Sequence, residues 1–231
     1  MMSKIERLSD DVTLYQGDCR EILPTLGKFD AVVTDPPYGI GEAAGANKSR
    51  GNLAVAKDYG VATWDDATAD EAVALAISKA NHSMIFGGNY YNLPPTSCWL
   101  VWDKINGDND FADCELAWTN LKKAVRRIRF RWHGMLRQNN EPRGDHPTQK
   151  PIEVMRWCIG HLPVEAKSII DPFMGSGTTG VASVKMGRQF TGIELEPKYF
   201  DIACRRISEA MKQPDLFIEQ PKTATKQEAM I

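Results

Sequence analysis

A glycine-rich turn in the last third of the chain constrains the fold more than any other feature. Residues 175–180 have the pattern G-x-G-x-x-G, follow the short apolar run Ser168–Asp171 and open a helical pattern that ends at Gly187. Glu194 comes nineteen residues after the first glycine, at the end of the next apolar run. A strand, a tight turn, a helix and a following acidic residue are together typical of a nucleotide-binding unit in a parallel α/β sheet.

The residues just before these glycines indicate which ligand such a unit binds. They are Asp171-Pro172-Phe173-Met174, which place a carboxylate at the end of the strand. This charge would repel the pyrophosphate of a dinucleotide and attract the ammonium and sulfonium of S-adenosylmethionine. A glycine turn that serves only close packing is the alternative, but here strand, turn, helix and acidic residue all coincide. We therefore expect an S-adenosylmethionine site in which Glu194 accepts hydrogen bonds from ribose hydroxyls.

A second motif, Asp35-Pro36-Pro37-Tyr38, ends the apolar run Phe29–Thr34. Two consecutive prolines cannot donate ladder hydrogen bonds, so they end the strand and hold it rigidly at the carboxyl edge, where ligands bind in open α/β sheets. There the Asp35 carboxylate and the Pro36 carbonyl would accept both hydrogens of an exocyclic amino group and return its lone pair to the nitrogen. Tyr38 would stack on the base. Taken alone, the motif fits a rigid turn equally well.

The rest of the chain alternates short apolar runs with helical patterns, which predicts an α/β protein. Further strands are expected at Val12–Gln16, 83–86, 98–102 and Gln189–Glu194. Helices are expected after a capping box of Thr68 and Glu71, and at Pro151 and Pro197. With 231 residues, 42% of them hydrophobic, and a formal charge of -2, the composition excludes a basic nucleic-acid coat, a collagen-like chain and a mostly disordered chain. A local basic patch remains compatible with this balance.

The cysteines and the amino-terminal segment bear on the compartment. Five cysteines are scattered without a C-x-x-C pair, so the sequence predicts neither a structural zinc site nor a disulfide framework. The first residues carry charges throughout and contain no apolar core of a signal peptide, and the apolar runs are too short to span a bilayer. We expect a cytoplasmic protein that holds no metal.

Taken together, the motifs resemble the DNA amino-methyltransferases, specifically the beta class that methylates adenine N6 or cytosine N4. D-P-P-Y begins at Asp35, H-P-T-Q-K-P at His146 and D-P-F-M-G-S-G-T-T at Asp171, so the catalytic half precedes the cofactor half. The similarity covers residues 12–207. It implies a Rossmann-like S-adenosylmethionine-dependent methyltransferase fold with a mixed, mostly parallel seven-stranded sheet, a permuted motif order and a target base flipped out of the duplex.

The resemblance also implies a role for each matching residue. The catalytic motif is Asp35, Pro36, Pro37 and Tyr38, and Asp35 would also contact the cofactor. Residues that would bind S-adenosylmethionine are Asp18, Cys19, Thr148, Lys150, Asp171, Phe173, Gly175, Ser176, Gly177, Thr178 and Glu194. Of these, the glycine-loop residues would line the methionine end, Thr148 and Lys150 would close the site, and Asp18 would accept from the adenine amino group.

The reaction expected is site-specific transfer of a methyl group to adenine N6 in DNA, because the D-P-P-Y motif begins with Asp rather than Ser. Cytosine-N4 methylation is the alternative on the same scaffold. A nicotinamide-dependent oxidoreductase would share the glycine pattern but leave D-P-P-Y unexplained. A non-catalytic DNA-binding relic would have little reason to keep both motifs. A partner restriction enzyme is compatible with the resemblance.

The chain is short for this class, and we expect it to carry no large recognition domain. We expect one catalytic domain over residues 1–212, with inserted DNA-contacting loops near 39–64 and 105–143, and a flexible tail over 213–231. Arginines alternate with Ile128, Phe130 and Trp132, which predicts a strand with one basic face and favours phosphate binding over a merely solvated face. The residues expected to contact DNA are Lys48, Arg50, Arg127, Arg129, Arg131 and Arg137.

The expected partner is double-stranded DNA, and the resemblance is compatible with a homodimer. In the tail, Gln213-Pro-Asp-Leu-Phe217 resembles short peptides by which bacterial proteins dock on the replication sliding clamp. We favour the alternative that Leu216 and Phe217 fold back on the protein's own surface.

Overall fold

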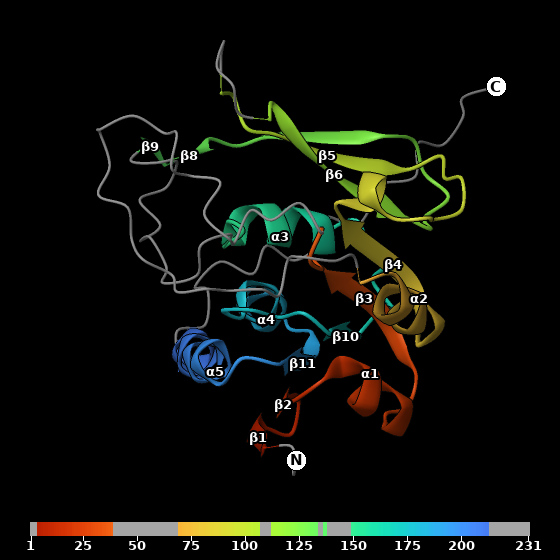
Figure 1. Ribbon diagram of the computed structural model, residues 1–231. Helices are drawn as coiled ribbons and strands as arrows, with labels where there is room; N and C mark the ends of the chain where they lie inside the picture. Colours follow the sequence, from red (N-terminus) through yellow and green to blue (C-terminus); the bar gives the residue numbers. More distant parts are fainter. Residues whose placement is uncertain (1–3, 39–68, 107–111, 134–135, 138–148, 213–231) are drawn as a thin grey trace, which may run out of the picture.

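The computed structural model of the protein describes residues 4–38, 69–106, 112–133, 136–137 and 149–212. These residues form a mixed sheet of nine strands with helices on both faces, and a separate two-stranded ribbon (Figure 1). The strands of the sheet are β1 (Lys4–Ser9), β2 (Val12–Gln16), β3 (Phe29–Thr34), β4 (Ala80–Phe86), β5 (Trp99–Asp103), β6 (Cys114–Thr119), β7 (Arg126–Arg129), β10 (Ser168–Asp171) and β11 (Gln189–Glu194). The ribbon consists of β8 (Trp132–His133) and β9 (Leu136–Arg137). The helices are α1 (Cys19–Ile22), α2 (Asp70–Ser78), α3 (Ile152–Ile159), α4 (Thr178–Lys185) and α5 (Pro197–Lys212), with 3-10 turns η1 (Leu23–Thr25) and η4 (Gly88–Tyr90).

The centre of the sheet is parallel and its edges are partly antiparallel. Strands β2, β11, β10, β3 and β4 lie side by side and run parallel. β1 pairs antiparallel with β2 at one edge, and β6 lies antiparallel between β4 and β5 near the other. Helices α3, α4 and α5 cover one face, and α1 and α2 cover the other (Figure 1).

Neighbouring residues of the central strands enter two separate hydrophobic cores, because side chains alternate between the faces of a strand. Val33 and Phe86 pack in the core that α3, α4 and α5 cover. Val32 and Ile85 pack in the core that α1 and α2 cover. Because both faces are buried, these strands are continuous apolar runs in the sequence.

Most of the expected elements are confirmed. The strands expected at Val12–Gln16, Phe29–Thr34, Ser168–Asp171 and Gln189–Glu194 have those bounds. The strand expected at 83–86 begins earlier, at Ala80, and the strand expected at 98–102 is Trp99–Asp103. The capping box is wrong, because Ala69 occupies the cap position of α2 and makes no side-chain cap bond. Thr68 itself lies outside the described residues.

Among the described residues, the sheet has nine strands rather than the expected seven. β1 is a charged edge strand whose first four residues are exposed, so it lacks an apolar pattern. β6 lies in the range 105–143, where we expected an inserted loop apart from the basic strand through Ile128, Phe130 and Trp132; this range also contains β7, β8 and β9. The α/β class and the Rossmann-like arrangement of the parallel strands agree with the expectation.

In the described part of the chain, no helix combines the length and the apolar character that crossing a membrane requires.

Candidate active site

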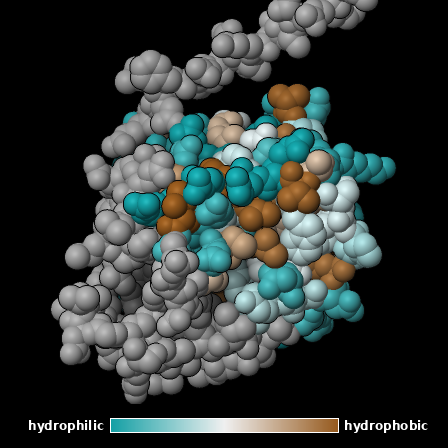
Figure 2. Space-filling view, turned by 90° about the horizontal axis from the view of Figure 1, so that it is seen from above, coloured by the Kyte–Doolittle hydropathy of each residue, from teal (hydrophilic) through white to brown (hydrophobic). Residues whose placement is uncertain are grey.

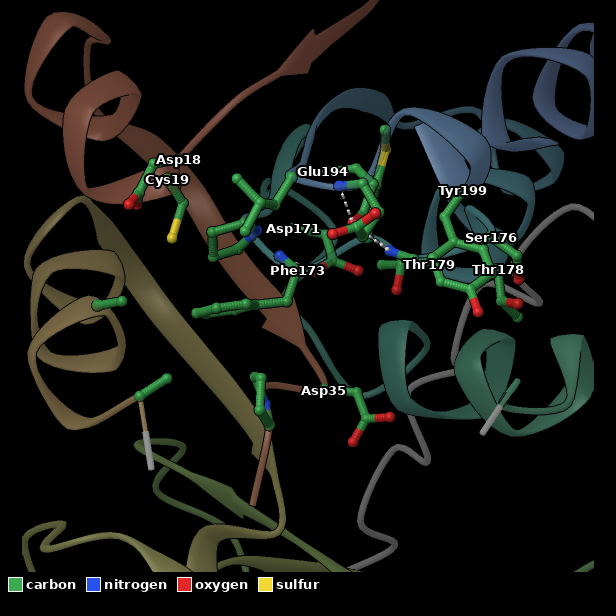
Figure 3. A pocket seen from close by; sticks show the side chains of 18 of the residues that line it. Asp18, Cys19, Asp35, Asp171, Phe173, Ser176, Thr178, Thr179, Glu194 and Tyr199 are labelled. Carbon is green, nitrogen blue, oxygen red and sulfur yellow. Dashed lines mark hydrogen bonds between the residues drawn. The ribbon is translucent and has the colours of Figure 1, made fainter. Parts of the chain in front are cut away.

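The connections of the sheet create a crevice at the carboxyl ends of β3 and β10. These strands are neighbours, but α4 follows β10 on one face of the sheet while α2 follows β3 on the other. Ligands bind at such points in open α/β sheets. A cavity of about 480 Å³ lies there, within the range of cofactor pockets. In the view of Figure 3, Asp171 and Phe173 lie between Asp18 on one side and Asp35 on the other.

Glu194, at the end of β11, holds the start of the glycine loop. One carboxylate oxygen accepts a hydrogen bond from the Gly175 backbone N–H at 2.8 Å, and the other accepts one from the Glu196 N–H at 2.8 Å (Figure 3). Burial raises the pKa of Glu194 to about 7. Glu194 lines the cavity, so a ligand with hydroxyl groups can engage its remaining acceptor sites.

Asp171, at the end of β10, is a buried carboxylate on the cavity wall, with 2% of its surface exposed. Its Oδ1 atom accepts hydrogen bonds from the Thr34 hydroxyl at 2.6 Å and from the Phe173 N–H at 3.0 Å. Burial raises the pKa of Asp171 to about 6 despite these bonds. A cationic group of a ligand would therefore interact strongly with the Asp171 carboxylate, because little water is present there to screen the two charges.

The three glycines of the loop have different roles. Gly175 lines the cavity. Gly177 adopts a left-handed conformation with φ +81°, and a Cβ atom there would lie 2.9 Å from the Ala203 side chain of α5. A Cβ atom at Gly180 would lie 2.4 Å from Ile207. The second and third glycines therefore allow α4 to pack closely on α5. A cofactor contact by the Gly177 backbone stays a prediction.

Ser176 links the glycine loop to two other segments. Its hydroxyl donates to the Gln149 side chain at 3.1 Å. Arg206 of α5 donates to the Ser176 carbonyl at 2.7 Å and to the Ser176 hydroxyl at 2.9 Å. The same guanidinium reaches the Thr178 hydroxyl at 3.2 Å. Ser176 and Thr178 both line the cavity, as expected, and these bonds hold them in place.

Asp18 and Cys19 also line the cavity, at the turn after β2. The Asp18 carboxylate accepts from the Arg20 N–H at 2.8 Å, which caps α1, and pairs with the Arg20 guanidinium at 2.5 Å. The Arg20 partner lowers the pKa of Asp18. Burial raises the pKa of the Cys19 thiol to about 12, so Cys19 is not a reactive thiolate.

Asp35 directly follows β3 at the far side of the cavity, and its carboxylate bonds to Tyr38 of the same motif and to Lys150. The Tyr38 hydroxyl donates to one oxygen of Asp35, and the Lys150 ammonium donates to the other. The backbone carbonyl of Pro37 accepts from the Tyr91 hydroxyl. Asp35, Pro37 and Lys150 line the cavity, and Pro36 is buried beside them.

Lys150, which we expected to close the cofactor site, lines the cavity at the end where Asp35 lies. Its ammonium, on a side chain with 9% exposed surface, lies between Asp35 and Glu115 of β6. The Nζ atom is 3.2 Å from Glu115 Oε2. The H-P-T-Q-K-P motif thus serves both ends of the site, with Gln149 at the glycine loop and Lys150 at Asp35.

Residues after β4 complete the site, and the sequence reasoning missed them. The Tyr90 ring stacks on the Tyr38 ring with centroids 5.1 Å apart and an interplanar angle of 18°. Gly87, with φ +63°, leaves room for Tyr38, because a Cβ atom there would come within 2.1 Å of its ring. The available signal was the Gly87-Gly88 turn directly after an apolar strand, followed by two tyrosines.

The basic strand is shorter than expected. β7 ends at Arg129 and β8 begins at Trp132, so Arg131 lies between them. Arg129 forms an ion pair with Asp103 at 3.1 Å, and Arg127 approaches the same carboxylate at 3.9 Å. Figure 2 shows hydrophilic side chains interspersed with hydrophobic ones on the face seen from above. Both arginines remain exposed and available to an external anion.

Some expected residues lie outside the described part of the chain. They are Lys48, Arg50, Thr148 and the tail peptide from Gln213 to Phe217, together with the loop 39–64. Arg137 is described only as a residue of β9.

Comparison with known proteins identifies the family. The family model for DNA methylases of the N6/N4 type matches residues 78–205, more than half of the chain. This range contains Lys150 and the glycine loop, and D-P-P-Y precedes it. The type II methyltransferase M2.LlaDCHI of Lactococcus lactis subsp. cremoris is 26% identical over 90% of this chain and 93% of its own length.

Two solved structures share the fold. The M1.HpyAVI complex with S-adenosylmethionine aligns with a TM-score of 0.57 and 22% identity, covering 85% of this chain and 98% of that one. The cytosine-N4-specific PvuII DNA methyltransferase aligns with a TM-score of 0.51 and 14% identity, covering 88% and 92%. The extent of the family match, on a fold that brings the matched glycine loop and Lys150 to one cavity, shows that this chain belongs to the N6/N4 family of DNA methylases.

Proposed function

We propose that the protein transfers a methyl group from S-adenosylmethionine to N6 of adenine in double-stranded DNA. One observation carries the proposal: a single cavity joins Asp171 and Glu194, where the cofactor would bind, to Asp35, where an amino group would react. Membership of the DNA methylase family supports methyl transfer to DNA. The Asp at the start of D-P-P-Y supports adenine as the target.

The chemistry of the cavity fits S-adenosylmethionine. Asp171 presents a buried carboxylate to an ammonium, Glu194 presents acceptors to ribose hydroxyls, and Phe173 adds an apolar surface. Asp18 would accept from the adenine amino group at the other end. When bound, S-adenosylmethionine supplies an electrophilic methyl group on a sulfonium, which departs as a neutral thioether. The complex of M1.HpyAVI with this cofactor supports the same choice.

The D-P-P-Y motif would hold and activate the target base. The base leaves the duplex, because an amino group within the stack cannot reach the methyl group. Asp35 and the Pro36 carbonyl each accept one amino hydrogen, and Tyr38 stacks on the ring. The nitrogen lone pair forms the new N–C bond as the C–S bond breaks, and one amino proton passes through Asp35 to water. Positioning accounts for most of the rate, so no covalent enzyme intermediate is needed.

Arg127, Arg129 and Arg131 would bind DNA phosphates. The Arg129 pair with Asp103 is a surface contact and would be exchanged at little cost for a phosphate contact. Nonspecific attraction of this kind orients the duplex but carries no sequence information.

Tritium transfer from labelled S-adenosylmethionine to unmethylated genomic DNA, followed by nucleoside chromatography, tests the proposal. Label in N6-methyladenine is the expected result. Label in N4-methylcytosine would retain the family and the cofactor but overturn the choice of base. Cofactor binding without any transfer of label to DNA would contradict the activity itself.

A further inference from the structure

A buried row of alternating charges adjoins the candidate catalytic residue. The Lys150 ammonium donates to Asp35 and lies 3.2 Å from Glu115, and Glu115 in turn pairs with Lys104 at 2.6 Å. Asp35, Glu115 and Lys104 each expose only about a fifth of their side chains. Charges so poorly solvated interact more strongly than surface pairs.

One carboxylate oxygen of Glu115 can accept a further hydrogen bond. Within the described part of the chain, its buried Oε2 atom has no hydrogen-bond partner, although the Lys150 ammonium lies 3.2 Å away. Oε2 thus faces the ammonium at ion-pair distance, whereas the contact of the ammonium with Asp35 is shorter. A small movement of the flexible Lys150 side chain would therefore satisfy Glu115, and it would release Asp35 at the same time.

Release of Asp35 matters for the proposed reaction. The attacking nitrogen gains positive charge as it takes the methyl group, so a negative field stabilises the transition state. The ion pair of Asp35 and Lys150 has no net charge. The Asp35 carboxylate in this pair is therefore a weaker acceptor for the amino hydrogen than a free carboxylate. The Nζ atom also lies 5.7 Å from the centroid of the Tyr38 ring, so a base stacked on Tyr38 would lie close to this cation.

We propose that Glu115 is a positioning residue that draws the Lys150 ammonium away from Asp35 when the target base enters, so that Asp35 accepts the amino hydrogen as a free carboxylate. The inference rests on the proposed methyl transfer and extends it to a residue outside both motifs. The shift of Lys150 leaves the Asp35 carboxylate without an ion-pair partner but not without a hydrogen bond, because the entering amino group donates to it in place of the ammonium.

The charges around Asp35 predict how its titration responds to Glu115. The charged or titratable groups that act on Asp35 are Tyr38, Glu115, Lys150 and Asp171, and Lys104 pairs with Glu115 behind them. Burial raises the pKa of Asp35, Lys150 opposes this, and the Glu115 charge raises it further. Although burial acts in the opposite direction, Lys150 and Lys104 lower the pKa of Glu115, which keeps it ionised. Removing the Glu115 charge should therefore lower the pKa of Asp35.

Steady-state methyl transfer as a function of pH tests the proposal in three variants. Glu115→Gln keeps the size and removes the charge, Glu115→Asp keeps the charge, and Lys104→Gln removes the cation beside Glu115. In Glu115→Gln we expect kcat to fall roughly tenfold or more, with cofactor affinity unchanged. We expect the acid side of the kcat–pH profile, where kcat falls as Asp35 is protonated, to move to lower pH in Glu115→Gln and to higher pH in Lys104→Gln. Glu115→Asp should keep the wild-type profile and recover part of kcat.

The outcomes separate this inference from the proposed function. If the wild-type protein transfers no methyl group, the proposed function fails and the shift of Lys150 fails with it. If the wild type is active and the acid side of the kcat–pH profile stays in place in Glu115→Gln and Lys104→Gln, only the role of Glu115 is overturned. If Glu115→Gln does not fold, the Lys104→Gln variant tests the proposal alone: a shift of the acid side of its kcat–pH profile to higher pH supports the proposal, and an unchanged profile overturns it. Equal losses of kcat and thermal stability in Glu115→Gln and Glu115→Asp would indicate a structural role and overturn the proposal.

Discussion

The Tyr90 ring lies parallel to the Tyr38 ring, with centroids 5.1 Å apart, and 45% of Tyr90 is exposed. The stack joins the turn after β4 to the D-P-P-Y motif after β3. Tyr91, the next residue, donates its hydroxyl to the Pro37 carbonyl. Two successive tyrosines thus hold the proposed base-binding motif from a neighbouring strand.

Removing the Tyr90 ring should loosen Tyr38. We expect Tyr90→Ala to lower kcat/KM for DNA by roughly threefold to tenfold, which is the size of one aromatic pair, and to leave cofactor affinity unchanged. Tyr90→Phe keeps the stack and should behave as wild type. Higher activity in Tyr90→Ala would mean that this ring blocks the base instead of supporting Tyr38.

Gly87 should tolerate no side chain. Its left-handed backbone disfavours other residues, and an alanine methyl would overlap the Tyr38 ring. We expect Gly87→Ala to displace Tyr38 and to reduce methyl transfer by at least about tenfold, measured at saturating cofactor. Gly27→Ala is the matched control, because nothing lies within 4 Å of a Cβ atom there. Comparable losses in both variants would count against a specific clash with Tyr38.

Asp35→Asn should separate chemistry from cofactor binding. The amide keeps the shape but replaces one acceptor oxygen by a donor, which cannot accept the amino hydrogen. We expect S-adenosylmethionine affinity within about threefold of wild type and a loss of roughly a hundredfold or more in kcat, measured by calorimetry and tritium transfer. A near-normal rate would remove Asp35 from the catalytic role.

Cofactor affinity should depend on pH through Asp171. Burial raises its pKa to about 6, so the free protein takes up a proton there as the pH falls from 7 to 5. A bound ammonium needs the ionised form, and we therefore expect Kd for S-adenosylmethionine to rise over this range. Glu194, with a pKa of about 7, should add a weaker dependence between pH 8 and 6. Calorimetry at intervals of one pH unit measures both.

Asp171→Asn is the control for this pH dependence. Its Oδ1 can still accept from Thr34 and Phe173, but the charge is gone. The raised pKa means that ionised Asp171 destabilises the folded state above pH 6, since the unfolded state ionises more readily. We expect Asp171→Asn to bind the cofactor weakly at every pH and to have a higher Tm than wild type at pH 8. A Tm unchanged or lower would contradict the burial argument.

The last glycine of the loop should matter for stability. A methyl group at Gly180 would meet Ile207 and Phe190 at less than 3.0 Å in a packed core. Overpacking of this kind costs about 1–3 kcal/mol, and we expect Gly180→Ala to lower the free energy of unfolding by that amount in urea titrations. The double variant Gly180→Ala with Ile207→Val should recover part of the loss. If the single variant is as stable as wild type, the α4–α5 contact is looser than the structure indicates.

The sequence alone determined the parallel centre of the fold and both motifs of the site. Val32 and Val33 belong to a continuous apolar run, which predicts a strand without knowledge of tertiary contacts. The run is continuous because a strand covered on both faces has no polar side. The D-P-P-Y and glycine motifs can also be recognised in the sequence, because backbone geometry restricts the residue types that can occupy tight turns.

Tertiary structure alone decided which residues meet these motifs. Glu115 stands in a segment without a recognisable pattern, and the Gly87-Gly88 turn before Tyr90 indicates a turn but not its partner. Only the pairing of β6 with β4 brings Glu115 to Lys150, and only the turn after β4 brings Tyr90 to Tyr38. Lys150 was noticed in the sequence, but its partner was not, because ion pairs between residues far apart in the chain leave no local pattern. The glycine pattern likewise does not reveal that Gly177 and Gly180 also allow α5 to pack closely against the loop and α4. Local patterns encode strands and turns, whereas the identity of a neighbour across the sheet depends on the path of the whole chain.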